Sequence, residues 1–172
     1  KKVKHLYLGI ESGLDDVLKF MKKDHDLAQA YQAIDRLHEA GLIYDAHIMT
    51  GVAGKGRGME NAEALAQFLN RTNPAHVVNF SMFLHKEVPL YQDIRQGTFV
   101  PADELETIRE EYHLIERIAP EKAGANILYD GFHDFIHVRV RGHLPGDKEK
   151  MLAKLNGIIQ EYEGKEPVYS FV

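Results

Sequence analysis

The chain has 172 residues, of which 44% are hydrophobic and 27% charged, a composition typical of a globular domain and not of a disordered or fibrous protein. Its net charge of −5 provides no basic surface for nucleic acid, and no apolar run reaches the roughly 20 residues of a membrane-spanning helix. We therefore expect a compact soluble protein that binds neither nucleic acids nor membranes, and the absence of cysteine, which fits a reducing compartment, leads us to expect a cytoplasmic location.

The predicted elements alternate between strands and helices along the chain. Apolar runs predict strands at residues 5–10, 43–49 and 76–83. Apolar residues three to four apart predict helices around residues 14–21, 27–37, 62–69, 105–118 and 151–162. We expect Gly41 to end the second helix and Asn61 to cap the third. The order of the elements predicts a parallel α/β sheet with crossover helices.

Each predicted strand has one polar face. The face that contains the polar residues consists of His5, Tyr7, Gly9 and Glu11 in the first strand, Asp45, His47 and Met49 in the second, and Asn79, Ser81 and Phe83 in the third. A parallel strand that is covered on both sides should be apolar on both faces. The polar faces therefore predict a barrel lumen that holds a polar ligand near the carboxyl ends of the strands. Solvent-exposed strands at a sheet edge are the alternative.

Three further motifs do not by themselves indicate a phosphate-binding or metal-binding site. The glycine-rich segment 51–58 has the spacing of neither a P-loop nor a dinucleotide-binding turn, so we predict a flexible loop after the second strand. His133 and His137 have helical spacing for a metal, but their apolar neighbours predict a strand that separates them. Glu110 and His113 form the Glu-x-x-His pattern of di-iron bundles without a second copy, and we predict a charged surface of a helix.

Four segments resemble parts of radical S-adenosylmethionine (radical SAM) enzymes. Residues 6–25 resemble the fourth strand and its helix, and residues 47–69 resemble the fifth strand, its glycine-rich turn and its helix. Residues 77–99 resemble the sixth strand and a loop with Pro-Leu-Tyr. Residues 142–155 are similar to a tail of oxygen-independent coproporphyrinogen III oxidase-like Fe–S oxidoreductases.

The resemblance implies a partial (β/α) barrel, the C-terminal half of a (β/α)6 TIM-like barrel, over residues 1–120. A C-terminal extension follows over 121–172 and ends in the amphipathic helix; within it, residues 123–142 should be irregular or form a hairpin. In the family, a [4Fe–4S] cluster reductively cleaves S-adenosylmethionine to a 5′-deoxyadenosyl radical. The parent protein would also need an electron donor and a small-molecule substrate, which the sequence does not identify.

The family's cluster is held by three cysteines in a Cys-x-x-x-Cys-x-x-Cys loop, and this chain contains no cysteine. We therefore expect that it binds no metal and is inactive alone. The chain starts without methionine and enters a strand pattern within a few residues, so we expect a piece of a longer protein.

The resemblance also implies a set of cofactor contacts. The residues at the matching positions are Glu11, Ser12, Lys23, His47, Gly51 and Phe83. Glu11, with Ser12 beside it, would bind the ribose or the amino group. Lys23 replaces an arginine at the methionine carboxylate, which keeps the charge but loses the bidentate fork. His47 replaces an aspartate at the ribose hydroxyls, while Gly51 and Phe83 would contact the adenine.

Two other interpretations remain open. The first is a non-enzymatic α/β small-molecule-binding or interaction module, with His47, Asn79 and Ser81 lining a pocket. The second is a complete flavodoxin-like domain that binds a phosphate at its glycine-rich loop. The free sheet edges of a half-barrel further predict a homo-oligomer.

Overall fold

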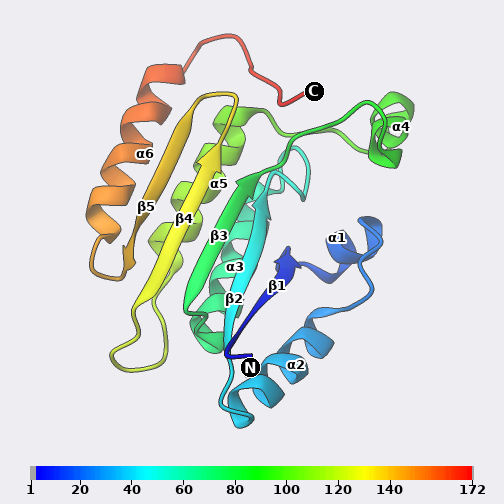
Figure 1. Cartoon of the computed structure of the whole chain (residues 1–172). Helices are drawn as coiled ribbons and strands as arrows, with labels where there is room; N and C mark the ends of the chain where they lie inside the picture. The colour runs from blue at the N-terminus through cyan, green and yellow to red at the C-terminus, as the bar shows by residue number, and fades with distance from the viewer. Residues whose placement is uncertain (1–2, 172) are drawn as a thin grey trace.

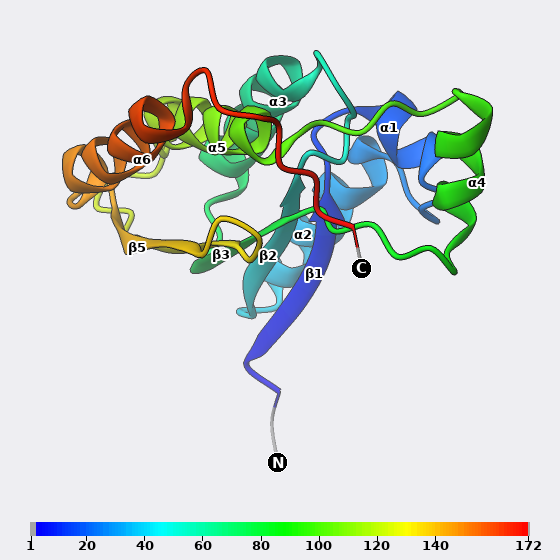
Figure 2. The same ribbon diagram turned by 90° about the horizontal axis from the view of Figure 1, so that it is seen from above.

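The computed structural model describes residues 3–171, which form one five-stranded sheet with its main helices on one face (Figures 1 and 2). The strands are β1 (His5–Glu11), β2 (Ile43–Thr50), β3 (His76–Ser81), β4 (Ile127–His133) and β5 (Val138–Leu144). The helices are α1 (Asp15–Phe20), α2 (Leu27–Glu39), α3 (Gly58–Thr72), α4 (Pro89–Gln96), α5 (Glu104–Arg117) and α6 (Lys148–Tyr162). Within residues 3–171, no helix is long and apolar enough to cross a bilayer.

The sheet has the order of an opened barrel. β1 to β4 lie side by side in chain order and run parallel, while β5 returns antiparallel to β4. β1 and β5 form the two edges and do not pair with each other, so the predicted partial β/α barrel is confirmed. Figure 2 shows the sheet curving from β5 to β1 with α3, α5 and α6 on its outer side.

The segment after α5 belongs to the same sheet. Of the two structures expected for residues 123–142, the hairpin is correct, because β4 and β5 pair over seven positions. β4 also continues the parallel series, which the sequence did not reveal. The domain boundary expected near residue 120 falls in the loop between α5 and β4, and the strands on both sides of it belong to the same sheet.

One apolar core lies between the sheet and the helices that cover it. Its largest fully buried side chains include Tyr44, Ile48, Leu65, Phe68, Leu69, Ile108, Leu114, Ile115 and Tyr129. Because alternate strand residues point to one face, this core explains the apolar positions of β1 and β2. A second, smaller cluster lies at the carboxyl ends of the strands, under α1 and α4, and includes Val17, Val52, Met82, Leu84 and Phe99.

Of the two residues predicted at helix ends, Gly41 is correct and Asn61 is wrong. Gly41 follows α2 with a φ of 70°, which is the left-handed conformation of a C-terminal glycine, as predicted. Asn61 is not a cap, because α3 already begins at Gly58 and places Asn61 in its first turn, where it is fully buried. α4 was not predicted; none of its residues is fully buried, and only Leu90 and Ile94 pack against the second cluster.

The faces of β3 are the reverse of the prediction. Val78 pairs with His47 in register, and Phe80 pairs with Met49, so the apolar residues of β3 share the open face with His47. Asn79 and Ser81 point instead into the helix layer and are buried. These two residues therefore cannot line a pocket together with His47.

Buried carboxylates of α5 cause this reversal. Asn79 Nδ2 donates to Glu111 Oε1 at 3.1 Å, and Ser81 Oγ donates to Glu104 Oε1 at 3.0 Å. A buried carboxylate must be hydrogen-bonded, so the strand that faces it needs polar residues. The polar side of β3 thus faces the protein interior.

Candidate cofactor site at the carboxyl ends of the strands

Glu11 ends β1 in a strained turn. Its φ is 64°, and the Ser12 N–H donates to the Ile10 carbonyl at 2.8 Å, which closes a three-residue γ-turn around Glu11. The pairing with β2 slips at the same point, because Gly9 pairs with His47 but Glu11 pairs with Ile48. Such a backbone costs about 1–3 kcal/mol for a residue other than glycine, and such conformations cluster at functional sites.

The turn directs the Glu11 side chain back over the open face of the sheet. Its Oε1 lies 2.6 Å from the place where a side chain on Gly9 would begin, so only glycine leaves room for it. Lys23 Nζ donates to the same oxygen at 3.2 Å. Since Gly9 pairs with His47, the imidazole lies on the same face of the neighbouring strand. The structure thus brings together Glu11, Lys23 and His47.

Ser12, in the turn after β1, and Gly51, in the turn after β2, make their hydrogen bonds toward the helix side of the sheet and not toward its open face. Ser12 is fully buried and its Oγ donates to Asn61 Oδ1 at 2.6 Å. The Gly51 N–H donates to Glu110 Oε2 at 2.8 Å, and a side chain at Gly51 would collide with the methyl group of Thr107 at 2.7 Å. Both residues direct these groups into the protein, and their contact with a ligand stays a prediction.

Phe83 follows β3 at the mouth of the site and is 55% exposed. The C-terminal tail fixes the loop that carries it, because the Leu84 N–H donates to the Ser170 carbonyl at 2.6 Å and Leu84 forms a bridge with Phe171. Figure 2 shows this tail running from α6 across the sheet to the end of β3. Phe83 therefore lies on a loop that the C-terminal tail fixes in place, next to the carboxyl ends of the strands.

A row of rings crosses the open face below this mouth. Tyr7, His47, Phe80 and Phe132 lie in sequence, with ring centroids 5.2, 5.9 and 5.7 Å apart. The Arg139 guanidinium lies 4.7 Å from the centroid of Phe132 and continues the row to β5. The sequence prediction missed Phe80 and Phe132 because it placed Phe80 on the opposite face. The row offers flat apolar surface beside the Glu11–Lys23 pair.

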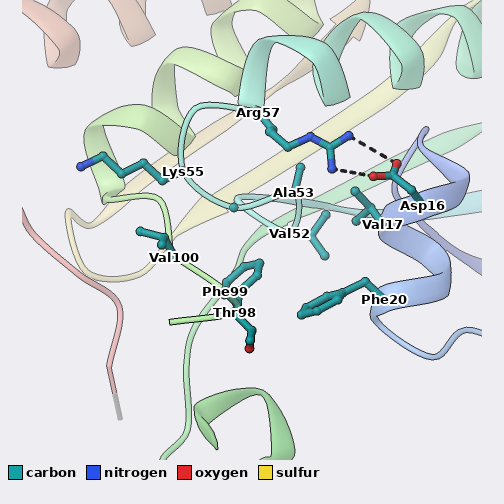
Figure 3. A pocket seen from close by; sticks show the side chains of 11 residues that line it. Asp16, Val17, Phe20, Val52, Ala53, Lys55, Arg57, Thr98, Phe99 and Val100 are labelled. Carbon is teal, nitrogen blue, oxygen red and sulfur yellow. Dashed lines mark hydrogen bonds and ion pairs between the residues drawn. The ribbon is translucent and has the colours of Figure 1, made fainter. Parts of the chain in front are cut away.

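A pocket of ≈ 380 Å³ opens between α1, the glycine-rich turn and the segment at residues 98–100 (Figure 3). Phe20 and Phe99 stack at 5.8 Å on one side of it. On its rim, Arg57 Nη1 donates to Asp16 Oδ2 at 2.7 Å and holds the pKa of that carboxyl below its usual value. Lys55 also lines the pocket, with its side chain pointing away from the paired rings (Figure 3), and Arg57 is engaged by two carboxylates.

The comparisons with known proteins concern the fold. No protein-family model and no curated protein sequence matches the chain. The chain shares its fold with archaeal Elp3. The structure of Methanocaldococcus infernus Elp3 lacking residues 1–46 matches with a TM-score of 0.65 and 18% sequence identity. The match covers 93% of this chain but only 36% of the Elp3 chain, so this protein spans about a third of that length.

The site residues fit one of the two groups that the radical SAM resemblance implies. The chain has no cysteine, and residues 3–171 contain no group of three or more His, Asp or Glu side chains that could hold a metal. The iron–sulfur cluster therefore has no ligands here. Lys23 and Glu11 place a cation and an anion side by side, and the carboxylate and amino group of an amino acid such as the methionine part of S-adenosylmethionine would have the complementary charges.

A second set of functional groups lies on the helix side of the sheet. His133 is buried between two carboxylates of α5, with Nε2 3.0 Å from Glu111 Oε2 and Nδ1 3.3 Å from Glu104 Oε2. Burial alone would lower the pKa of His133, but the carboxylates of Glu111 and Glu104 outweigh it and raise it to about 9. The imidazole is therefore a cation held between two acids.

Glu110 is buried as well. Burial raises the pKa of Glu110 to about 8, and the hydrogen bonds from Asn61 and Gly51 offset only part of the loss of water. The prediction of a charged surface around Glu110 is therefore wrong. A signal was present, because Glu110 shares one helix face with Leu114, four residues later, and Leu114 is a core residue.

Proposed function

We propose that this chain is part of a radical SAM oxidoreductase and that its open sheet face binds S-adenosylmethionine. The observation that carries this proposal is the strained Glu11 turn, which pairs Glu11 with Lys23 over Gly9 at the end of a parallel strand. The fold shared with Elp3, itself a radical SAM superfamily member, supports it. On the resemblance of residues 142–155, we place the parent protein among the coproporphyrinogen oxidase-like members.

The residues of this chain would bind and orient the cofactor. Lys23 would pair with its methionine carboxylate, and Glu11 would accept from its amino group or ribose. His47 would reach the ribose hydroxyls, and Phe83 would pack on the adenine. Each charge-assisted hydrogen bond would contribute about 1.5–3 kcal/mol. A cluster held by the rest of the parent would supply one electron, and S-adenosylmethionine, as the electron acceptor, would supply the radical chemistry.

Binding of S-adenosylmethionine to the purified chain tests this proposal. We expect saturable binding by isothermal titration calorimetry, and Lys23→Met or Glu11→Gln should raise Kd by about 10- to 100-fold, because each removes a charge-assisted contact. Lys19→Met is the matched control, since it removes an exposed lysine from the nearby α1. Absence of saturable binding to the unmodified chain, or an equal loss in the control, would refute the proposal.

Glu11→Gly should separate binding from stability. Glycine adopts a φ of 64° without strain, so we expect the free energy of unfolding to rise by about 1 kcal/mol even though the surface pair with Lys23 is lost. Binding of S-adenosylmethionine should be lost in the same variant. Urea denaturation followed by circular dichroism measures the first effect. Glu11→Gln keeps the strain and should show no such gain; a destabilised glycine variant would argue against a strained turn.

The alternative is a non-enzymatic small-molecule-binding module. The pocket between Phe20 and Phe99 favours it, because that pocket is formed by this chain alone. The coding sequence upstream of residue 1 separates the two proposals. A Cys-x-x-x-Cys-x-x-Cys loop about 100 residues before it, the length of three βα units, would support the radical SAM protein. An open reading frame that begins at residue 1 would favour the module.

A further inference from the structure

Two buried side chains tie together the turns at the ends of β1 and β2. Asn61 Oδ1 accepts from Ser12 Oγ at 2.6 Å and from the Gly13 N–H at 3.2 Å. Asn61 Nδ2 in turn donates to Glu110 Oε1 at 2.7 Å, and Glu110 Oε2 accepts from the Gly51 N–H at 2.8 Å. A continuous chain of hydrogen bonds thus runs from one turn to the other through α3 and α5.

The packing leaves this chain of hydrogen bonds little freedom. Asn61 is fully buried, and Glu110 is 1% exposed. A side chain on Gly13 would meet the α3 backbone at 2.5 Å, and one on Gly58 would meet Glu110 Oε2 at 3.0 Å. α3 therefore presses directly on both the first turn and the Glu110 carboxylate. The amide of Asn61 has only one orientation that places its oxygen against the two donors Ser12 and Gly13 and its N–H2 group against the accepting oxygen of Glu110.

The strained turn at Glu11 depends on its two C-terminal neighbours. A residue other than glycine keeps a left-handed φ only when its surroundings hold it there. Ser12 and Gly13 come directly after Glu11, and both are bound by Asn61. We propose that Asn61 and Glu110 are positioning residues that hold the Glu11 turn and couple it to the Gly51 turn. What Glu11 binds rests on the proposed function, whereas the coupling of the two turns concerns only residues of this chain.

Reversing the direction of the hydrogen bond between Asn61 and Glu110 tests the coupling of the two turns. Glu110→Gln introduces an amide whose N–H2 group must face a donor, because Gly51 and Asn61 both donate to Glu110. Asn61→Asp removes the N–H2 group that donates to Glu110 and places two acidic groups side by side. The double variant Asn61→Asp/Glu110→Gln satisfies every group again, since the introduced amide can donate to the introduced carboxylate and accept from the Gly51 N–H. The single variants should therefore be impaired and the double variant restored.

Amide hydrogen exchange, read by NMR, reports the coupling without any ligand. In Glu110→Gln, exchange at Gly13 should rise by about 10-fold or more together with exchange at Gly51, although Glu110 does not contact Gly13. Ser12→Ala, a mild change at the other end, should raise exchange at Gly51. The double variant should return both amides toward their original rates. Ile34→Val is the control, because it weakens the core under α2 without touching either turn.

Three outcomes would overturn the coupling. The first is faster amide exchange at Gly51 without faster exchange at Gly13 in Glu110→Gln, and the second is unchanged exchange at Gly51 in Ser12→Ala. The third is a double variant that does not fold or whose exchange rates are not restored.

Titration of the same variants with S-adenosylmethionine should show Kd raised in each single variant and recovered in the double variant. Coupled amides in a chain that does not bind S-adenosylmethionine would refute the proposed function alone. Binding with uncoupled amides would refute the positioning role alone.

Discussion

Replacing His133 with leucine is expected to lower the free energy of unfolding by about 3–5 kcal/mol, the usual cost of removing one partner from a buried ion pair. The imidazole is almost fully buried and contacts Glu104 on one side and Glu111 on the other. Without it, two carboxylates would face each other in the interior with no cation. Urea denaturation followed by circular dichroism measures the change, since the chain has no tryptophan.

His113→Leu is the matched control for this prediction. His113 lies on the same helix as Glu104 and Glu111, but the two glutamates it faces, Glu63 and Glu116, are about half exposed. A surface pair of this kind contributes about 0–1 kcal/mol, so the control should lose little stability. Combining His133→Leu with Glu104→Gln and Glu111→Gln should recover part of the loss, because the uncompensated charges disappear. Equal costs for the two histidines would show that the buried triad does not stabilise the fold.

The triad joins parts of the molecule that are distant in sequence. Glu111 also accepts from Asn79 of β3 and from the Tyr129 hydroxyl of β4 at 2.9 Å. Glu104 accepts from Ser81 at the end of β3 and from Ser170 in the C-terminal tail. One helix thus fixes two central strands and the tail that supports the Phe83 loop. The candidate cofactor site on the open face rests on this polar layer behind the sheet.

The alternation of strands and helices predicted the parallel α/β sheet, and the resemblance to radical SAM enzymes predicted that this sheet is part of a barrel. β1 and β2 each have a clear apolar face, and both were oriented correctly, so Glu11 and His47 were expected on the same side. β3 was not, because Val78 and Phe80 are apolar while Asn79 and Ser81 are polar, and the usual rule places apolar residues inward. The rule failed because α5 contributes carboxylates to the interior, and only the three-dimensional structure shows which strand faces them.

The local geometry at Glu11 could not be predicted either. A left-handed residue is normally signalled by glycine, and Glu11 is not one. The flanking glycines were the available signal: Gly9 leaves room for the Glu11 side chain, and Gly13 lets α3 approach the turn. The sequence pattern predicts a helix cap at Asn61, a role that asparagine often has in other proteins. Its actual partners, Ser12 and Glu110, are each 49 residues away along the chain.

The stability of the chain is expected to fall as the pH rises from about 5 to 9. His133 has an ordinary pKa of 6.5 and a folded value of about 9, so its contribution is complete below 6.5 and is lost as the pH rises through 9. Glu110 has an ordinary pKa of 4.5 and a folded value of about 8, so its folded form also keeps a proton that the unfolded chain releases. Each such proton changes the free energy of unfolding by up to about 1.4 kcal/mol per pH unit, and the two effects have the same sign.

Urea denaturation at several pH values measures this profile, and Glu110→Gln divides it. Glutamine does not titrate, so the variant should lose the decline that begins near the ordinary pKa of 4.5 and keep the one that begins near 6.5 from His133. Groups near Glu110 contribute in known directions, because Glu106 raises its pKa and His133 lowers it. A free energy of unfolding that stays level or rises between pH 5 and 9 would mean that neither buried group keeps its proton in the fold. The hydrogen bonds that hold the Glu11 turn would then end on a Glu110 carboxylate that is already charged at neutral pH.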